Sequence, residues 1–156
     1  MKKFVVFLMA LCLVCAAAAA LAEAAPSFDD MPAAVVEDEN TTIEEASFAG
    51  DWVVDKAFVS TIYVDLETLA AENGISIGKI HIGDGKMALT SAENGEEKTE
   101  ELAYTFQAGQ IQFQDAESGL NGCIDLLEDG NTCMSIFIPV SEEQTVEVSL
   151  FLVRAE

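Results

Sequence analysis

The chain has 156 residues, of which 28 are Asp or Glu, 7 are Lys or Arg and one is His, so its formal net charge is −21. A surface this acidic repels nucleic-acid phosphates and anionic membrane surfaces, which excludes both as partners. High negative charge also keeps a protein soluble, so it does not by itself indicate a cationic partner.

The N-terminus has the three parts of a secretory signal peptide: two lysines, an unbroken apolar run over 4–22, and small residues around a cleavage site. Ala20-Leu21-Ala22 is the preferred site. Cleavage after Ala22 removes two lysines and no acid, which gives a mature chain of charge −23. We therefore expect 1–22 to be a signal peptide and the mature protein to be secreted, either extracellular or attached to the cell surface. Because about 20 apolar residues can span a bilayer, an uncleaved anchor is the alternative.

Residues 23–47 have the composition of a disordered linker. This segment contains eight acidic residues, two prolines and no basic residue, and it shows no sustained hydrophobic period. Such a composition cannot bury enough apolar surface to offset the entropy lost on ordering. We predict an acidic disordered linker over 23–47 and a single folded domain over 48–156.

The folded part shows period-two alternation of apolar and polar residues with turn signals every eight to twelve residues, which is typical of an all-β sandwich or barrel. The predicted strands cover 50–60, 75–82, 86–91, 99–107, 110–114, 123–128, 132–138 and 145–154.

One helix is predicted over 66–73, with Asp65 as its N-cap and Gly74 at its end. In the strand that follows, the apolar parity changes between Ile77 and Ile80, which predicts a β-bulge at Gly78.

Most of the predicted strands are joined by short turns such as Asp84-Gly85 and Asn94-Gly95. Consecutive hairpins form a meander, and closing an eight-stranded meander removes both exposed edges. We therefore predict an eight-stranded antiparallel up-and-down β-barrel with one short helix after the first strand. A two-sheet β-sandwich is the alternative, although it requires longer crossing connections than these loops provide.

Gly50-x-Trp52 opens the first predicted strand, and Arg154 lies at the end of the last one. Together with the helix after the first strand, this arrangement resembles the lipocalin and wider calycin pattern, and most closely the small secreted lipocalin-like domains of bacteria. The resemblance covers 48–156. It implies that Trp52 closes the floor of the barrel and that Arg154 lies across the indole face. A guanidinium in that position contributes about 0.5–2 kcal/mol.

An eight-stranded barrel is wide enough either for a core of side chains or for one small ligand. The side chains predicted to line an apolar pocket near the open end are those of Phe58, Tyr104, Phe106, Phe113 and Leu150. Two functions remain open at this point. One is a secreted, non-catalytic binding domain that holds a small hydrophobic molecule in the barrel mouth. The other is an extracellular interaction or structural domain with a filled core. We expect a monomer.

The sequence offers no motif for catalysis or metal binding. His81 is the only histidine, and no cysteine or paired acids lie near it at zinc-ligand spacing. The acidic residues form no calcium-loop pattern, and no serine lies in a Gly-x-Ser-x-Gly elbow. We predict a protein that is not an enzyme and that uses no metal or cofactor.

Cys123 and Cys133 are the only cysteines after residue 22, and two cysteines in an exported domain suggest a disulfide. A two-residue turn at Asp129-Gly130 would place Cys123 opposite Ile136 and Cys133 opposite Leu126, with the thiols on opposite sides of the ribbon. A bulge or a longer loop would bring them to the same side. The sequence leaves this disulfide undecided.

Overall fold

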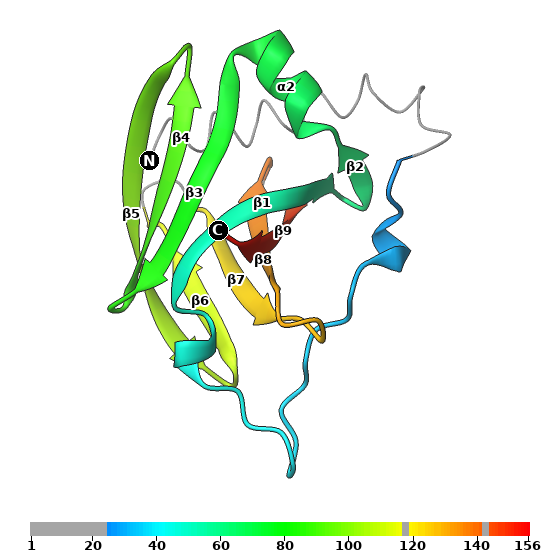
Figure 1. Cartoon of the computed structure of the whole chain (residues 1–156), viewed down its shortest axis with the longest axis vertical. Helices are drawn as coiled ribbons and strands as arrows, with labels where there is room; N and C mark the ends of the chain where they lie inside the picture. Colours follow the sequence, from blue (N-terminus) through cyan, green and yellow to red (C-terminus); the bar gives the residue numbers. More distant parts are fainter. Residues whose placement is uncertain (1–24, 117–118, 142–143) are drawn as a thin grey trace.

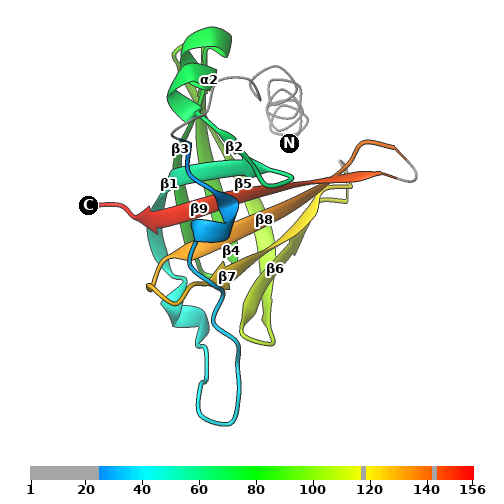
Figure 2. The same ribbon diagram turned by 90° about the vertical axis from the view of Figure 1, so that its right-hand side faces the viewer.

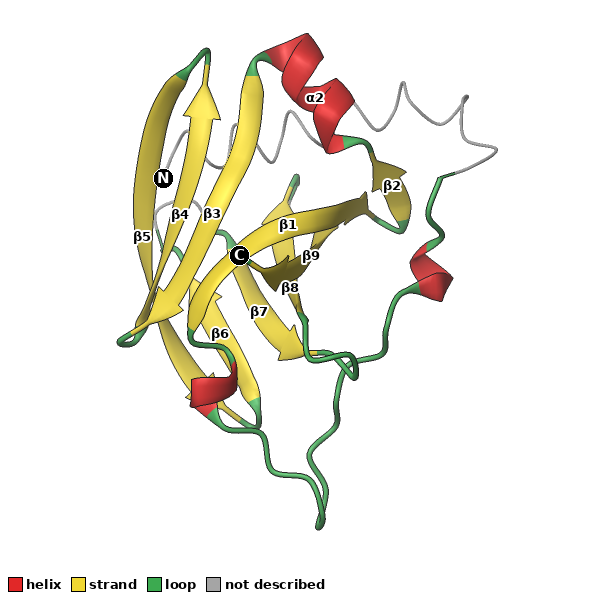
Figure 3. Ribbon diagram, in the orientation of Figure 1, coloured by secondary structure: helices red, strands yellow, loops and turns green. Residues whose placement is uncertain are grey.

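The computed structural model describes residues 25–116, 119–141 and 144–156, so the predicted signal peptide over 1–22 lies outside the described residues. Strands dominate these ranges (Figure 3). The strands are β1 (Gly50–Val59), β2 (Ile62–Val64), β3 (Ile75–Gly83), β4 (Lys86–Glu93), β5 (Glu96–Gln107), β6 (Gln110–Gln114), β7 (Asn121–Leu126), β8 (Thr132–Pro139) and β9 (Thr145–Arg154). The helical elements are the 3₁₀ helices η1 (Phe28–Asp30) and η2 (Glu45–Ser47) and the α-helix α2 (Leu66–Asn73). None of them has the length and apolar character that crossing a membrane requires.

Eight of the strands form a closed antiparallel barrel (Figure 1). From β3 onward each strand pairs with the next, and β1 pairs with both β3 and β9, which closes the sheet on itself. This confirms the predicted up-and-down barrel against the two-sheet sandwich. β2 was not predicted. It is a three-residue strand folded back on the end of β1 by a turn in which Ser60 and Thr61 both have positive φ, and neither residue type signals such a turn.

The predicted helix is confirmed in position and in both of its caps. The Asp65 side chain accepts hydrogen bonds from the backbone N–H groups of Glu67 and Thr68, as an N-cap does. Gly74 ends the helix in the left-handed region at φ 66°, and its N–H donates to the carbonyl of Ala70.

Two irregularities change which side chains point into the barrel. The register between β3 and β4 shifts between Ile77 and Ile80, which is the predicted bulge. The register between β1 and β9 also shifts, between Val54 and Lys56. After this second bulge the alternation of β1 is reversed, so that Phe58 points outward. The prediction that Phe58 lines the interior is therefore wrong.

The described part of the predicted linker lies along the outside of the barrel (Figure 2). The Val35 N–H donates to the Leu126 carbonyl at 2.8 Å, and the Glu128 N–H donates to the Ala33 carbonyl at 3.0 Å. A β-bridge joins Ala34 to Leu127. The chain is thus hydrogen-bonded to the barrel over residues 33–35, although the composition of this segment predicts disorder. The domain boundary at residue 48 stays a prediction.

Apolar contacts explain this difference. An outer cluster, separate from the core inside the barrel, consists of Phe58, Leu127, Cys133 and Phe151, with Phe28, Met31 and Tyr63 packed against it. The Phe28 ring packs edge-on against Phe58 and Phe151, with centroid distances of 5.3 and 6.0 Å. Phe28 and Met31 therefore cover barrel side chains that would otherwise face water, and this burial offsets the cost of ordering an acidic segment.

Candidate functional site

The first of the two barrel ends is sealed around Trp52, which is fully buried. The Trp52 indole N–H donates to the Phe48 carbonyl at 2.8 Å. The guanidinium carbon of Arg154 lies 4.0 Å from the centroid of the indole, and Arg154 also donates hydrogen bonds to the carbonyls of Ser47 and Ala49. This is the geometry that the lipocalin resemblance implies. We call this the sealed end.

Gly50 leaves the space that Arg154 occupies. A Cβ atom at this position would lie 2.5 Å from Nη1 of Arg154, and the backbone of Gly50 has a φ of 128°, which L-residues rarely adopt. The three residues of the sequence pattern, Gly50, Trp52 and Arg154, are thus one structural unit that closes the barrel.

Tyr104 and Phe106 lie at the sealed end, although the sequence analysis assigns them to the open end. The Phe106 ring is 6.0 Å from that of Phe48, and the Tyr104 hydroxyl donates to Glu45 at 3.0 Å. Burial and the neighbouring Glu45 carboxylate raise the pKa of Tyr104. Because β5 runs toward the sealed end, its last residues meet η2 and Phe48.

The other two predicted pocket residues belong to the packed interior. Phe113 is 6% exposed and faces Gly122, where a Cβ atom would lie 2.5 Å from the Phe113 ring. Leu150 has no exposed surface, and neither do Met134 and Ile136 from β8. Among the described residues, the middle of the barrel is therefore occupied by side chains, and a ligand site has to be sought at an end.

The second end, called the open end here, lies where β1 finishes and where β3, β5 and β9 begin. Three of its apolar side chains are only partly buried although they pack against the core: Leu66 from α2, Ile77 from β3 and Val146 from β9. Helix α2 stands at this end, beside the start of β3 (Figure 1). The sequence did not predict these three residues at the barrel mouth, because placing them requires the direction of each strand.

Charged side chains complete the open end. The half-buried face of β5 reads Lys98, Glu100, Leu102 and then the two aromatic residues, so it changes from charged to aromatic toward the sealed end. The Lys98 ammonium pairs with the carboxylate of Glu93 in β4 at 2.8 Å. The open end thus combines an apolar side, formed by α2, β3 and β9, with a polar side formed by β4 and β5.

The two cysteines both point to the outside of the barrel. Cys123 lies opposite Ser135, and Cys133 lies opposite Asp125, so the predicted register is wrong by one residue. The reason is that the connection is longer than a two-residue turn: the Leu127 N–H donates to the carbonyl of Asn131.

The thiols of Cys123 and Cys133 therefore face the same side of the ribbon, and both are free in the structure. Burial, followed for Cys123 by the nearby Asp125 carboxylate, raises the pKa of each thiol to about 12. Both cysteines are accordingly protonated at neutral pH and are poor nucleophiles.

His81 is exposed on the outer wall. Its Nδ1 lies 2.7 Å from Asp51 Oδ1, and Lys79 contacts the other oxygen of the same carboxylate at 3.1 Å. Both contacts lower the pKa of Asp51, that with His81 more strongly. In the part of the chain that the structure describes, no three His, Cys, Asp or Glu side chains are placed to hold a metal ion.

No protein-family model and no curated protein matches the chain. The solved structures that resemble it include those of bovine odorant-binding protein. A complex with its natural ligand has a TM-score of 0.46 and 16% identity, and covers 76% of this chain and 78% of that one. The protein from bovine nasal mucosa has 0.45 and 15%, with the same coverage. A complex with a selenium-containing odorant has 0.45 and 13%, with 78% of each chain covered.

The assignment of the fold rests on the strand order. In the part of the chain that the structure describes, the closed eight-stranded meander, the α-helix after its first long strand and the Trp52 floor together define a lipocalin-like β-barrel.

Proposed function

We propose that the protein is a non-catalytic binding domain that holds a small apolar molecule at the open end of its barrel. The observation that supports this is the difference between the two ends. At the sealed end Trp52 is fully buried beneath Arg154, and the partly buried Phe106 and Tyr104 contact Phe48 and Glu45. At the open end Leu66, Ile77 and Val146 remain partly uncovered. Apolar side chains left accessible at the mouth of a barrel are the usual lining of a ligand site.

The site favours a molecule with an apolar body and one polar group. The apolar body would pack against Ile77 and Val146, at about 25 cal/mol for each Å² of apolar surface removed from water. The polar group would meet the Lys98–Glu93 pair on the opposite side. Because the chain carries a net charge of −21, a neutral molecule approaches this site more readily than an anion does.

We further propose that the protein acts outside the cell. The support is the N-terminal sequence, which has the lysines, apolar run and alanine-rich cleavage site of a signal peptide. Mass spectrometry of the protein recovered from the culture medium tests this: cleavage after Ala22 is expected. Recovery in the membrane fraction with residues 1–22 retained would contradict it.

Titration with N-phenyl-1-naphthylamine, a neutral apolar fluorophore, tests binding. We expect saturable enhancement of its emission with one site per chain. Ile77→Arg and Val146→Arg, which place a charge at the open end, should each weaken binding at least tenfold. Val36→Arg is the matched control, because Val36 is 77% exposed and belongs to the segment outside the barrel. Equal affinity in all four proteins would overturn the proposal.

A protein-interaction domain is the second candidate, and exposed apolar side chains favour it. Ile62 in β2 and Val140 after β8 are 44% and 43% exposed, and both belong to elements at the open end. If this candidate is correct, Ile62→Lys and Val140→Lys abolish capture of a partner by the immobilised protein, while the fluorophore does not bind.

A further inference from the structure

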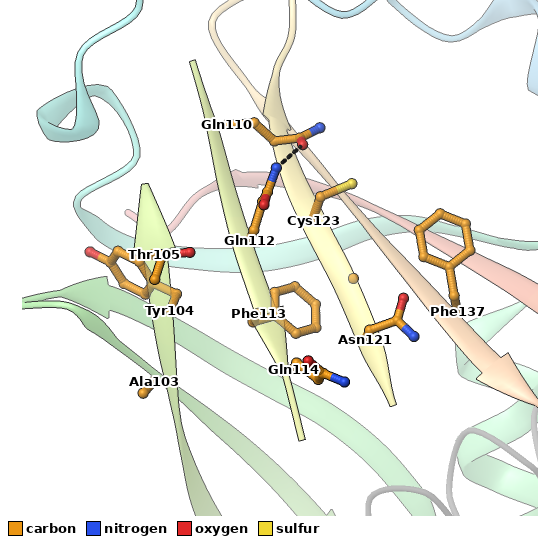
Figure 4. Close-up of a pocket in the computed structure, with 11 residues that line it drawn as sticks. Ala103, Tyr104, Thr105, Gln110, Gln112, Phe113, Gln114, Asn121, Cys123 and Phe137 are labelled. Carbon is orange, nitrogen blue, oxygen red and sulfur yellow. Dashed lines mark hydrogen bonds between the residues drawn. The ribbon is translucent and has the colours of Figure 1, made fainter. Parts of the chain in front are cut away.

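A groove of about 620 Å³ lies on the outer wall of the barrel, across β5, β6 and β7 (Figure 4). Gln110, Gln112 and Gln114 line it along β6, where they alternate with the buried Ile111 and Phe113. Because successive residues of a strand point to opposite faces, the three glutamines belong to the outside of the barrel. The groove is thus distinct from the open end, and its volume is within the range of ligand sites.

The residues that line the groove are uncharged, although the carboxylate of Asp125 contacts two of them, Gln110 and Cys123. The groove is lined further by Tyr104, Thr105, Asn121 and Cys123, and by the aromatic residues Phe113 and Phe137. No Asp, Glu, Lys or Arg lines it, although the chain contains 28 acidic and 7 basic residues. A ligand recognised by charge would therefore find no partner in this groove, whereas a neutral one avoids the cost of desolvating a charge.

The carboxamides of Gln110 and Gln112 are held in one orientation by two hydrogen bonds. Gln110 Nε2 donates to Asp125 Oδ1 at 2.6 Å. Since a carboxylate only accepts, the Gln110 nitrogen must face Asp125, and its oxygen is turned toward Gln112, whose Nε2 donates to it at 3.2 Å. The side-chain oxygen of Gln112 is then directed away from Gln110. A fixed orientation lowers the entropy lost when a ligand binds.

We propose that this groove binds a neutral oligosaccharide. A sugar hydroxyl both donates and accepts, and the carboxamides of Gln112, Gln114 and Asn121 offer both functions, so each amide can engage a hydroxyl pair. The Phe137 ring provides an apolar surface for the C–H face of a sugar ring. The lining therefore suits a neutral sugar in two ways: its residues carry no charge, and its carboxamides both donate and accept hydrogen bonds.

The test is a titration of the ¹⁵N-labelled protein with cellohexaose, maltohexaose and chitohexaose, followed through the side-chain amide signals of Gln and Asn. We expect at least one hexasaccharide to shift the signals of Gln112, Gln114 and Asn121. Gln112→Glu replaces two donors with an acceptor-only carboxylate and should weaken binding at least tenfold. Gln114→Glu, on the same exposed face, should act in the same direction. Asn40→Asp introduces the same charge into the exposed turn over 38–41, and we expect it to bind as the wild type does.

Three outcomes would overturn the proposal. The first is that none of the three sugars shifts these signals at millimolar concentration. The second is that a sugar shifts them but both glutamate variants bind as tightly as the wild type. The third is that a Gly-Ser peptide shifts the same signals and the sugars do not, which would make the groove a peptide site. Because the groove lies on the outer wall, Ile77→Arg should leave sugar binding unchanged, so this test is independent of the apolar site.

Discussion

The two ends of the barrel differ in the side chains that form them and in how completely those side chains are buried. At the sealed end, one large aromatic residue fills the floor, and both Trp52 and Arg154 have hydrogen-bond partners in the backbone of 47–49. At the open end, medium-sized apolar side chains stand beside a Lys–Glu pair, and none of the three apolar residues that define the open end is fully covered. The sealed end is thus held by hydrogen bonds and a cation–π contact, while the open end keeps apolar surface that a ligand could cover.

Removing the floor should have the largest effect. Trp52→Ala deletes a fully buried side chain and leaves a cavity, so we expect a loss of about 3–5 kcal/mol in the free energy of unfolding, measured with urea. Ile77→Ala at the open end removes a partly buried side chain and should cost less than half as much. Equal losses for the two variants would mean that the two ends do not differ as described.

The outer cluster should contribute the next largest effect. Phe28→Ala removes a ring that packs on Phe58 and Phe151, and we expect it to cost about 1–3 kcal/mol, below the full range for a buried Phe because Phe28 is only half-buried. The control is Val36→Ala in the same segment, which should leave the urea midpoint unchanged. If Phe28→Ala also leaves it unchanged, the segment does not pack on the barrel.

Arg154→Ala should cost about 1–2 kcal/mol, because it removes the cation–π contact and the hydrogen bonds to 47 and 49. It should also shift the emission of Trp52, which is the only tryptophan. Arg154→Lys keeps the charge but not the planar guanidinium, and we expect an intermediate result. An unchanged emission spectrum in Arg154→Ala would show that the guanidinium does not cover the indole.

Near neutral pH, the smallest effect concerns the two thiols. Their pKa is about 12 in the folded protein against an ordinary value of 9.0, so the folded state keeps protons that the unfolded state loses. Stability should therefore be unaffected below about pH 9 and should fall as pH rises from there toward 12. The Cys123→Ser, Cys133→Ser double variant should show a weaker fall between pH 8 and 10. Rapid reaction of the native protein with iodoacetamide at pH 8 would contradict the raised values.

Sequence reasoning succeeded where a local signal was sufficient. Alternation and turns indicated the eight barrel strands, Asp65 and Gly74 marked the helix, and the parity change at Ile77 and Ile80 located a bulge. It failed at the second bulge, between Val54 and Lys56, because no glycine marks it; the one signal there is Lys56, which interrupts the apolar face of Trp52, Val54 and Phe58. This single insertion turned a predicted pocket residue into part of the outer cluster.

Other features depend on tertiary contacts that no local pattern carries. Tyr104 and Phe106 were correctly expected on the inner face of their strand, but which end they reach follows from the path of β5 relative to η2. Similarly, Phe28 and Met31 are two apolar residues in an acidic segment, and their partners are the outward-pointing aromatic residues of β1 and β9, which no local pattern reveals.

The most direct test of the account is an NMR titration of the ¹⁵N-labelled protein with N-phenyl-1-naphthylamine. Trp52 supplies the only indole N–H signal, which reports on the sealed end through its hydrogen bond to Phe48. We predict that the backbone signals of Ile77, Val146 and α2 shift with ligand concentration while the indole signal does not move. A shift of the indole signal without changes at Ile77 and Val146 would place the ligand at the sealed end. It would contradict the proposal that the open end is the binding site.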